Sequence, residues 1–344
     1  MRVNRAWIFF IIYIVISFFF FLWVALPVLK EELDFQFYAD SKTYEKIALN
    51  DSESNLVQVG LNALGPVSIL KLLGPQSYFL IYLFNISLFI ASLYYISRNP
   101  ALNKKLFFLL VMASPISFTS LFSVNKEIIS LLCLALLIFF KDKLNIWKIG
   151  LLLIISYLIR WQFTLFILVF LLIDSPVNCF REKRRFSFLL MLISISVILY
   201  YTQDTIFKGL FDIFNRTADD YTAGRGTYKI LMDIQQQYGY FIAFIPKTLH
   251  LLVGMSSRYK FIFDFTDVYN NFILYWQGPL NALLLFWAFN KKMFNFDNDI
   301  FYMLLIYCVI FAITPIYAIR YFYPVYILLA YLVSLKTSGR IFKI

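Results

Sequence analysis

The chain has 344 residues, of which 61% are hydrophobic and 20% aromatic, whereas only 15% are charged. A water-soluble domain does not carry so large an apolar fraction, so the composition excludes an ordinary soluble protein and predicts a polytopic membrane protein. The net charge of +11 would favour nucleic acid as the partner of a soluble chain. In a membrane protein these cations instead set the orientation of the helices, so we expect membrane lipids as partners and no nucleic acid.

The apolar runs predict an all-α protein with about ten transmembrane helices. Arg2 and Arg5 precede the first run, which is longer than the core of a signal peptide and lacks a small-residue cleavage site. It should therefore stay attached as the first membrane helix. The predicted spans cover residues 7–28, 77–97, 106–122, 127–140, 149–160, 161–176, 187–202, 270–289, 300–317 and 321–336.

Basic residues gather in the short loops on one side of these spans, as in the run 181–185. The positive-inside rule therefore places both termini in the cytoplasm. Two longer loops, residues 29–76 and 203–269, then lie outside. A further span at 238–256 would invert the helices after it, so we expect that run to be interfacial or re-entrant. No linker divides the chain, and we expect one membrane domain over residues 1–344.

A polar, acidic stretch at residues 34–48 follows the first span. As a helix, it would place Asp40 and Tyr44 on one face, about one turn apart. One interpretation is a juxtamembrane helix whose charges are solvated and whose aromatic rings lie at the membrane surface. The other interpretation is a catalytic carboxylate, Asp40, held beside aromatic rings for work on a lipid-linked substrate.

Charged residues beside or within membrane spans are informative, because at the bilayer centre they cost about 2.5–3.5 kcal/mol to insert and usually serve a purpose. Lys126 and Glu127 interrupt a long apolar run, and they could simply pair with each other. Arg160 and Arg320 lie at two other tight turns, where an arginine can extend to the membrane surface. All four lie at outer helix ends in the predicted orientation, and arginine and lysine bind phosphate oxygens. We expect Lys126, Arg160 and Arg320 to line one outward-facing cavity together with Asp40 and Tyr44.

His250 is the only histidine and falls on the outer side in this orientation. A single histidine in an apolar helix is more often packed and hydrogen-bonded than catalytic, but it is a second candidate proton acceptor. Asp297 and Asp299 have the spacing of a metal-binding Asp-x-Asp motif, but they fall on the cytoplasmic side. The three cysteines have neither metal-site nor redox spacing. We expect no metal and no cofactor.

Three short motifs resemble those of polytopic enzymes that act on lipid-linked sugars. They are Asp40-Ser-Lys-Thr-Tyr44-Glu-Lys-Ile-Ala48 after the first helix, Leu158-Ile-Arg160-Trp-Gln at a helix–helix turn, and Arg320-Tyr-Phe-Tyr-Pro324 near the C-terminus. Together with the helical architecture, they resemble the Wzy-type polymerases of O-antigen and capsule and the GT-C-type glycosyltransferases. The resemblance covers the whole chain as an architecture, whereas its motifs are short.

GT-C enzymes place an acidic residue in the first outer loop as a base or metal ligand, and the resemblance implies this role for Asp40, with Asp34 second. Wzy-type polymerases hold undecaprenyl-diphosphate-linked glycans with arginines of their large periplasmic loops. For that role the resemblance implies one or more of Arg160, Arg216, Arg225, Arg258 or Arg320.

The leading hypothesis is a glycosyltransferase of the polysaccharide polymerase type in the bacterial inner membrane. It would join undecaprenyl-diphosphate-linked repeat units at the periplasmic face for lipopolysaccharide or capsule, with a chain-length regulator as a candidate partner. A GT-C-type transferase that moves one sugar from a polyprenyl-phosphate donor is the alternative, and a lipid-linked glycan flippase ranks third. The residues expected to contact the substrate are Tyr44, Lys126, Glu127, Arg160, Arg225, Arg258 and Arg320.

Overall fold

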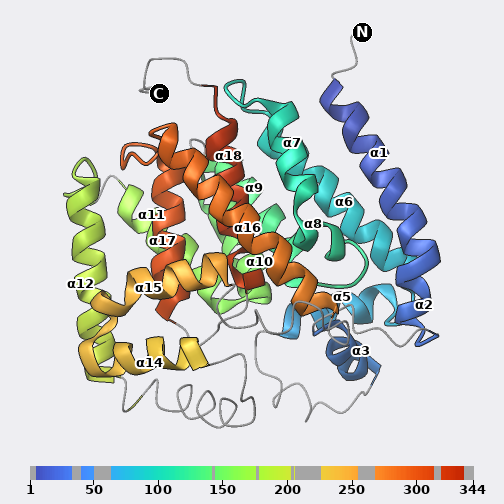
Figure 1. The fold of residues 1–344 in the computed structure, drawn as a ribbon, viewed down its shortest axis with the longest axis horizontal. Helices are drawn as coiled ribbons and strands as arrows, with labels where there is room; N and C mark the ends of the chain where they lie inside the picture. Colours follow the sequence, from blue (N-terminus) through green and yellow to red (C-terminus); the bar gives the residue numbers. More distant parts are fainter. Residues whose placement is uncertain are drawn as a thin grey trace.

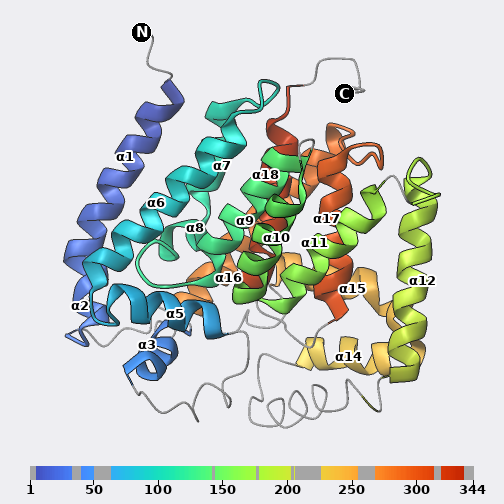
Figure 2. The same ribbon diagram turned by 180° about the vertical axis from the view of Figure 1, so that it is seen from behind.

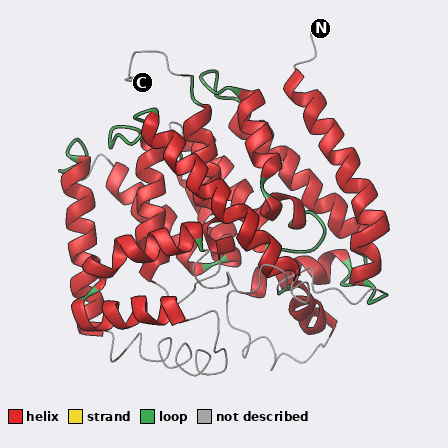
Figure 3. Ribbon diagram, viewed as in Figure 1, coloured by secondary structure: helices red, strands yellow, loops and turns green. Residues whose placement is uncertain are grey.

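A computed structural model describes residues 5–32, 40–49, 63–141, 144–175, 178–202, 205, 226–254, 268–313 and 319–336. Within these ranges every regular element is a helix, and the contact between Leu102 and Leu335 is an isolated bridge (Figure 3). The prediction of an all-α protein is confirmed for this part of the chain.

The first half of the chain forms helices along the predicted apolar runs. The first run is continuous but divided, because one π-helical turn separates α1 from α2. The third run breaks at Pro115, and the extended backbone of Ser114 before it ends one helix while its side chain caps the next. The bounds are α1 Arg5–Phe20, the π-helix Phe21–Ala25, α2 Leu26–Leu29, α3 Ser41–Leu49, α5 Leu64–Leu73, α6 Tyr78–Ser97, α7 Lys104–Ala113, α8 Pro115–Thr119 and α9 Lys126–Phe140.

The second half continues in the same way, with one additional helix pair. Residues 226–253 form α14 and α15, which lie at and near the lower end of the bundle in Figure 1. The bounds are α10 Ile146–Ile159, α11 Trp161–Asp174, α12 Arg184–Thr202, α14 Gly226–Tyr238, α15 Tyr240–Val253, α16 Val268–Asn290, α17 Asp299–Ile313, the 3-10 helix η5 Ile319–Phe322 and α18 Tyr323–Ser334.

The bundle has two distinct ends. Helix α1 begins and α18 ends at the upper end, whereas α3, α5 and α14 lie at the lower end (Figures 1 and 2). The centre is built on the last two long helices, since every residue of α18 is buried and almost every residue of α17. Helix α9 is also mostly buried, whereas α1, α6, α10, α11, α12 and α16 expose apolar side chains around this centre.

These outer helices present large apolar side chains to their surroundings. Ile11, Ile16 and Phe19 of α1 are each more than half exposed, and so is Ile198 of α12. A soluble monomer rarely exposes a continuous apolar surface of this kind, whereas lipid would cover it. Among the described residues, three stretches are long and apolar enough to cross a membrane: Trp7–Leu29, Tyr78–Ser97 and Arg184–Thr202.

A second, smaller hydrophobic core lies at the lower end, under α3. Tyr44, Ile47 and Ala48 of α3 pack there with residues of α5 and with Val124. Helix α5 in turn lies very close to α10, because a Cβ added to Gly65 would come within 2.1 Å of the carbonyl oxygen of Leu158. Glycine at this position therefore allows α5 to reach the turn that carries Arg160.

Candidate functional site

The polar stretch after the first span forms a helix that begins at Ser41, with Asp40 directly before it. Tyr44 lies one turn later, as the helical spacing predicted, and its hydroxyl donates a hydrogen bond to Asp40 Oδ2 at 3.4 Å. Its ring packs into the small core, where it is 4% exposed. Helix α3 thus turns one face inward, and Asp40 stands at the edge of that face.

Lys126 and Glu127 form the first turn of α9. They do not pair with each other: the Lys126 ammonium lies 5.3 Å from the centroid of the Tyr44 ring, a cation–π contact. Glu127 instead accepts a hydrogen bond from Arg160 Nη2 at 3.0 Å, and the side chains of this pair are 4% and 7% exposed. A carboxylate in the first turn also complements the positive end of the helix dipole.

Arg160 is fixed by the turn between two antiparallel helices. Its backbone is extended, and it caps the end of α10 and the start of α11 at once. Its guanidinium stacks on the Tyr321 ring, with Cζ 3.9 Å from the ring centroid. Arg160 therefore lies inside the protein between Glu127 and Tyr321, and the interpretation that it extends to the membrane surface does not describe this structure.

Arg320, in η5, completes a ring that the chain itself closes between the adjacent residues Lys126 and Glu127. Its Nη2 pairs with Asp40 Oδ2 at 2.9 Å. Its Cζ lies 5.3 Å from the centroid of the Tyr321 ring, which Arg160 also contacts. Residues separated by up to 280 positions thus converge at the lower end of the bundle. We call this set the ring cluster; it comprises Asp40, Tyr44, Lys126, Glu127, Arg160, Arg320 and Tyr321.

The ring cluster contains three cations and two carboxylates, so its formal charge is positive. Burial alone would raise the pKa of Asp40, but the charge and hydrogen bond of Arg320 outweigh it and hold that pKa below its ordinary value, with smaller contributions from Lys126 and Arg160. Asp40 is therefore ionised at neutral pH, and its side chain is 42% exposed.

Two buried polar atoms next to this turn have no hydrogen-bond partner among the described residues. Arg160 Nε is a donor and Gln162 Oε1 an acceptor, and the two residues are 6% and 3% exposed. An unsatisfied buried polar group costs about 1–3 kcal/mol, so such atoms usually meet water or a ligand. Arg160 thus keeps one donor, and Gln162 one acceptor, without a partner among the described residues.

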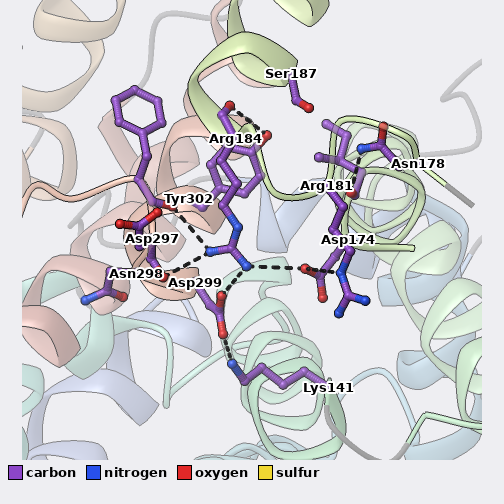
Figure 4. Close-up of polar contacts among 12 residues, drawn as sticks. Lys141, Asp174, Asn178, Arg181, Arg184, Ser187, Asp297, Asn298, Asp299 and Tyr302 are labelled. Atoms are coloured by element: carbon purple, nitrogen blue, oxygen red, sulfur yellow. Dashed lines mark hydrogen bonds and ion pairs between the residues drawn. The ribbon is translucent and has the colours of Figure 1, made fainter. Parts of the chain in front are cut away.

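A second charged group lies where α11 ends and α12 and α17 begin, at the upper end of the bundle in Figure 1, and Figure 4 shows its contacts. The Arg184 guanidinium pairs with Asp299 at 2.6 Å and with Asp174 at 3.3 Å, and it donates to the carbonyl oxygens of Phe296 and Asp297. Asp299, which has the spacing of an Asp-x-Asp motif with Asp297, is thus paired with two cations, Arg184 and Lys141. We call this set the Arg184 network; it comprises Lys141, Asp174, Arg181, Arg184 and Asp299.

Of the remaining predicted site residues, only His250 lies among the described residues. His250 is buried on α15, in the turn after Lys247. Asp34, Arg216, Arg225 and Arg258 lie outside the described residues. No group of three or more potential metal ligands occurs in the described part of the chain.

Sequence reasoning missed the aromatic partner of the two arginines. Tyr321 stacks on Arg160 and also lies near Arg320, although the motif beginning at Arg320 was noted only for its arginine. The adjacency of an arginine and a tyrosine at a tight turn was the available signal. The hydrogen bond from the Tyr78 hydroxyl to Glu45, 2.7 Å long, had no signal, because the two residues are 33 positions apart.

Comparisons with models of protein families, with curated proteins and with solved structures found no match.

Proposed function

We propose that this chain is a glycosyltransferase of the polysaccharide polymerase type in the bacterial inner membrane, acting on undecaprenyl-diphosphate-linked oligosaccharides. The observation that carries the proposal is the ring cluster, in which Lys126, Arg160 and Arg320 converge from three separate elements. Cations brought together at one end of an apolar bundle are suited to a lipid-linked anion, because the lipid lies beside the helices and the charged head at their ends.

In the proposed topology, about ten helices cross the membrane, both termini are cytoplasmic and the ring cluster faces the periplasm. In keeping with this topology, the two charged groups lie at opposite ends of the bundle, the Arg184 network at the end where α18 finishes and the ring cluster at the end with α3. Reporter fusions at Lys183 and Asp219 should report opposite sides of the membrane. Two cytoplasmic reports would contradict the topology.

The chemistry is the transfer of a glycan from its diphosphate carrier to a hydroxyl group. The acceptor oxygen attacks the anomeric carbon, the bond from that carbon to the phosphate oxygen breaks, and undecaprenyl diphosphate leaves with the electron pair. Arg160, Arg320 and Lys126 stabilise the negative charge of the leaving group. Asp40 or His250 takes the proton of the acceptor hydroxyl. Because Asp40 is held ionised, its carboxylate can accept a hydrogen bond from that hydroxyl at neutral pH.

A GT-C-type transferase with a polyprenyl-phosphate donor remains the second candidate, favoured by one observation. Asp40 is the more exposed member of its ion pair, since 42% of its side chain is exposed against 13% for Arg320. It therefore stands where a substrate hydroxyl could reach it, as a transferase that depends on a single carboxylate requires. A lipid-linked glycan flippase is the third candidate.

The surface glycan of a deletion strain separates these functions. A polymerase predicts loss of the long-chain ladder with one repeat unit retained, and restoration by the wild-type gene. A truncated repeat unit would favour the GT-C-type transferase instead, and loss of all surface glycan would favour the flippase. An unchanged ladder would contradict the proposed function.

A further inference from the structure

The ring cluster is closed in this structure. Tyr44, Lys126, Glu127 and Arg160 are each no more than 8% exposed, so a diphosphate carried by a lipid has no direct route to the two inner cations. Arg320 is more accessible, but its guanidinium already binds Asp40. If these cations bind a substrate, a part of the protein that covers them has to move.

Helix α3 is the part whose packing allows such movement. Its buried residues belong to the small core and not to the main core of the bundle, while Ile69 and Tyr78 contact both. Among the described helices, α3 packs mainly on α5. Lifting α3 would therefore expose a few apolar side chains without opening the bundle, and elements with few buried contacts are the ones that open locally.

Among the described residues, three ion pairs or hydrogen bonds hold α3 in place, besides the contact of Lys126 with the Tyr44 ring. Asp40 pairs with Arg320 at 2.9 Å, and Glu45 accepts a hydrogen bond from the Tyr78 hydroxyl at 2.7 Å. Lys42 and Glu31 form a third pair at 2.9 Å, but their side chains are 39% and 71% exposed, so solvent weakens it. The contact at Asp40 differs from the others because its partner is a cation of the ring cluster.

We propose that α3 is a lid over the ring cluster, and that Asp40 keeps it shut by occupying on Arg320 the position that a phosphate group of the ligand takes. This inference rests on the proposed function, since it assumes an anionic ligand. A diphosphate carries more charge than one carboxylate and presents several oxygens to a guanidinium fork, so it can displace Asp40. Displacement releases the lid and uncovers Lys126, which lies over the Tyr44 ring of α3 and then contacts the same diphosphate.

A cysteine placed under the lid tests this inference in the full-length protein purified in detergent. Ala48 is 6% exposed and faces the small core, whereas its neighbour Leu49 is 50% exposed. Ala48→Cys reports lid opening through its rate of maleimide labelling, and Leu49→Cys reports the reactivity of an exposed thiol on the same helix. Cys179→Ser removes the exposed native thiol, and the other two cysteines are buried.

The polar contacts that hold α3 predict an order of effects on the rate at which maleimide labels Ala48→Cys. Asp40→Asn should raise the rate about fivefold, the value of a partly exposed ion pair. Tyr78→Phe should raise it about tenfold, because it removes a hydrogen bond to a charged group. Lys42→Gln is the matched control on the same helix and should change it about twofold or less. Inorganic diphosphate should accelerate labelling in the protein with native Asp40, at constant ionic strength, and not after Asp40→Asn.

Labelling of Ala48→Cys that is insensitive to Asp40→Asn and Tyr78→Phe would overturn the lid, whatever the glycan of the deletion strain shows. A response to both substitutions but not to diphosphate would overturn the displacement of Asp40 by a phosphate group. If labelling responds to all three while deletion leaves the surface glycan unchanged, the lid stands and the proposed function fails. The two claims therefore fail separately.

Discussion

The two charged groups of this protein have similar residues but opposite designs. In the Arg184 network, Arg184 binds two carboxylates and two backbone carbonyl groups, and Asp299 also pairs with Lys141. In the ring cluster, each carboxylate has one arginine partner, a lysine rests on an aromatic ring, and Arg160 Nε has no partner among the described residues. In the Arg184 network every guanidinium and carboxylate group has a partner, and these contacts connect helix ends. The ring cluster keeps a buried donor without a partner among the described residues, and this donor can bind a ligand.

Burial sharpens this contrast. The Arg184 network is partly exposed, with 18% for the Arg184 side chain and 30% for Asp299, so water compensates when a partner is lost. The Glu127–Arg160 pair is almost fully buried, so neither charge can be left alone without a large cost. Substitutions at the two ends of the bundle should therefore have very different consequences.

Glu127→Ala should be the most damaging change. It leaves the buried Arg160 without its carboxylate, which costs about 3–5 kcal/mol of stability in comparable buried pairs. Lys141→Ala in the Arg184 network is the matched control and should cost about 1 kcal/mol or less, since Asp299 keeps Arg184. The thermal unfolding midpoint of the purified proteins measures both. Equal shifts would mean that the two groups do not differ in this way.

Replacing both members of the buried pair gives a second test of the same contrast. Glu127→Leu combined with Arg160→Met should recover most of the stability lost in Glu127→Ala, because an apolar pair of similar size does not have to be desolvated. The doubly substituted protein should be folded but unable to extend glycan chains. Stability as low as in Glu127→Ala would show that the cost arises elsewhere than in the uncompensated charge.

Gly65→Ala should disturb the ring cluster through packing alone. Its Cβ would meet the Leu158 carbonyl oxygen at 2.1 Å and push α5 from the turn that carries Arg160. Overpacking of this kind costs about 1–3 kcal/mol. Gly150→Ala on α10 is the control, because nothing lies within 4 Å of its added Cβ, and alanine in a helix gains about 1 kcal/mol over glycine. Unfolding midpoints that shift in the same direction would contradict the close approach of α5 and α10.

The smallest expected effect is that of acid. The pKa of Asp40 and that of Asp299 are both lowered in the folded protein, because burial, which would raise them, is outweighed by Arg320 in one case and by Lys141 and Arg184 in the other. Folding thus favours the ionised form of each group. Their contribution is complete above the ordinary pKa of about 3.9 and disappears as the pH falls through the lower folded values.

The Asp40 contribution should be about 1 kcal/mol or less, because the group is 42% exposed. The unfolding midpoint should therefore not change between pH 7 and about pH 4 through these two groups. Below that, the difference between the wild-type protein and Asp40→Asn should shrink. A difference that instead vanished near neutral pH would contradict the lowered pKa of Asp40.

The sequence predicted most of the long helices and singled out every member of the ring cluster except Tyr321, for identifiable reasons. Apolar runs of sufficient length mark helices directly, and charges such as Arg160 stand out because the surrounding residues are apolar. The spacing of Asp40 and Tyr44 also predicted their contact. These signals are local, so they can be seen without knowing how the helices pack.

The partners within the cluster could not be predicted, because they depend on packing between distant segments. Lys126 and Glu127 are adjacent and of opposite charge, yet Glu127 pairs with Arg160 and Lys126 lies on Tyr44. Successive helical residues point in different directions, so adjacency along the chain does not produce a pair. The stacking of Tyr321 between the arginines arises in the same way, from the turn before α18 meeting the turn before α11.

The central claim is that the ring cluster binds a diphosphate, and Arg160→Lys tests it most directly. Lysine keeps the charge but loses the planar fork that can hold Glu127 and a phosphate oxygen together. In a deletion strain complemented at matched protein level, Arg160→Lys should strongly shorten the surface glycan ladder, whereas Arg184→Lys should leave it unchanged. A normal ladder with Arg160→Lys would contradict the claim and reduce Arg160 to a structural partner of Glu127.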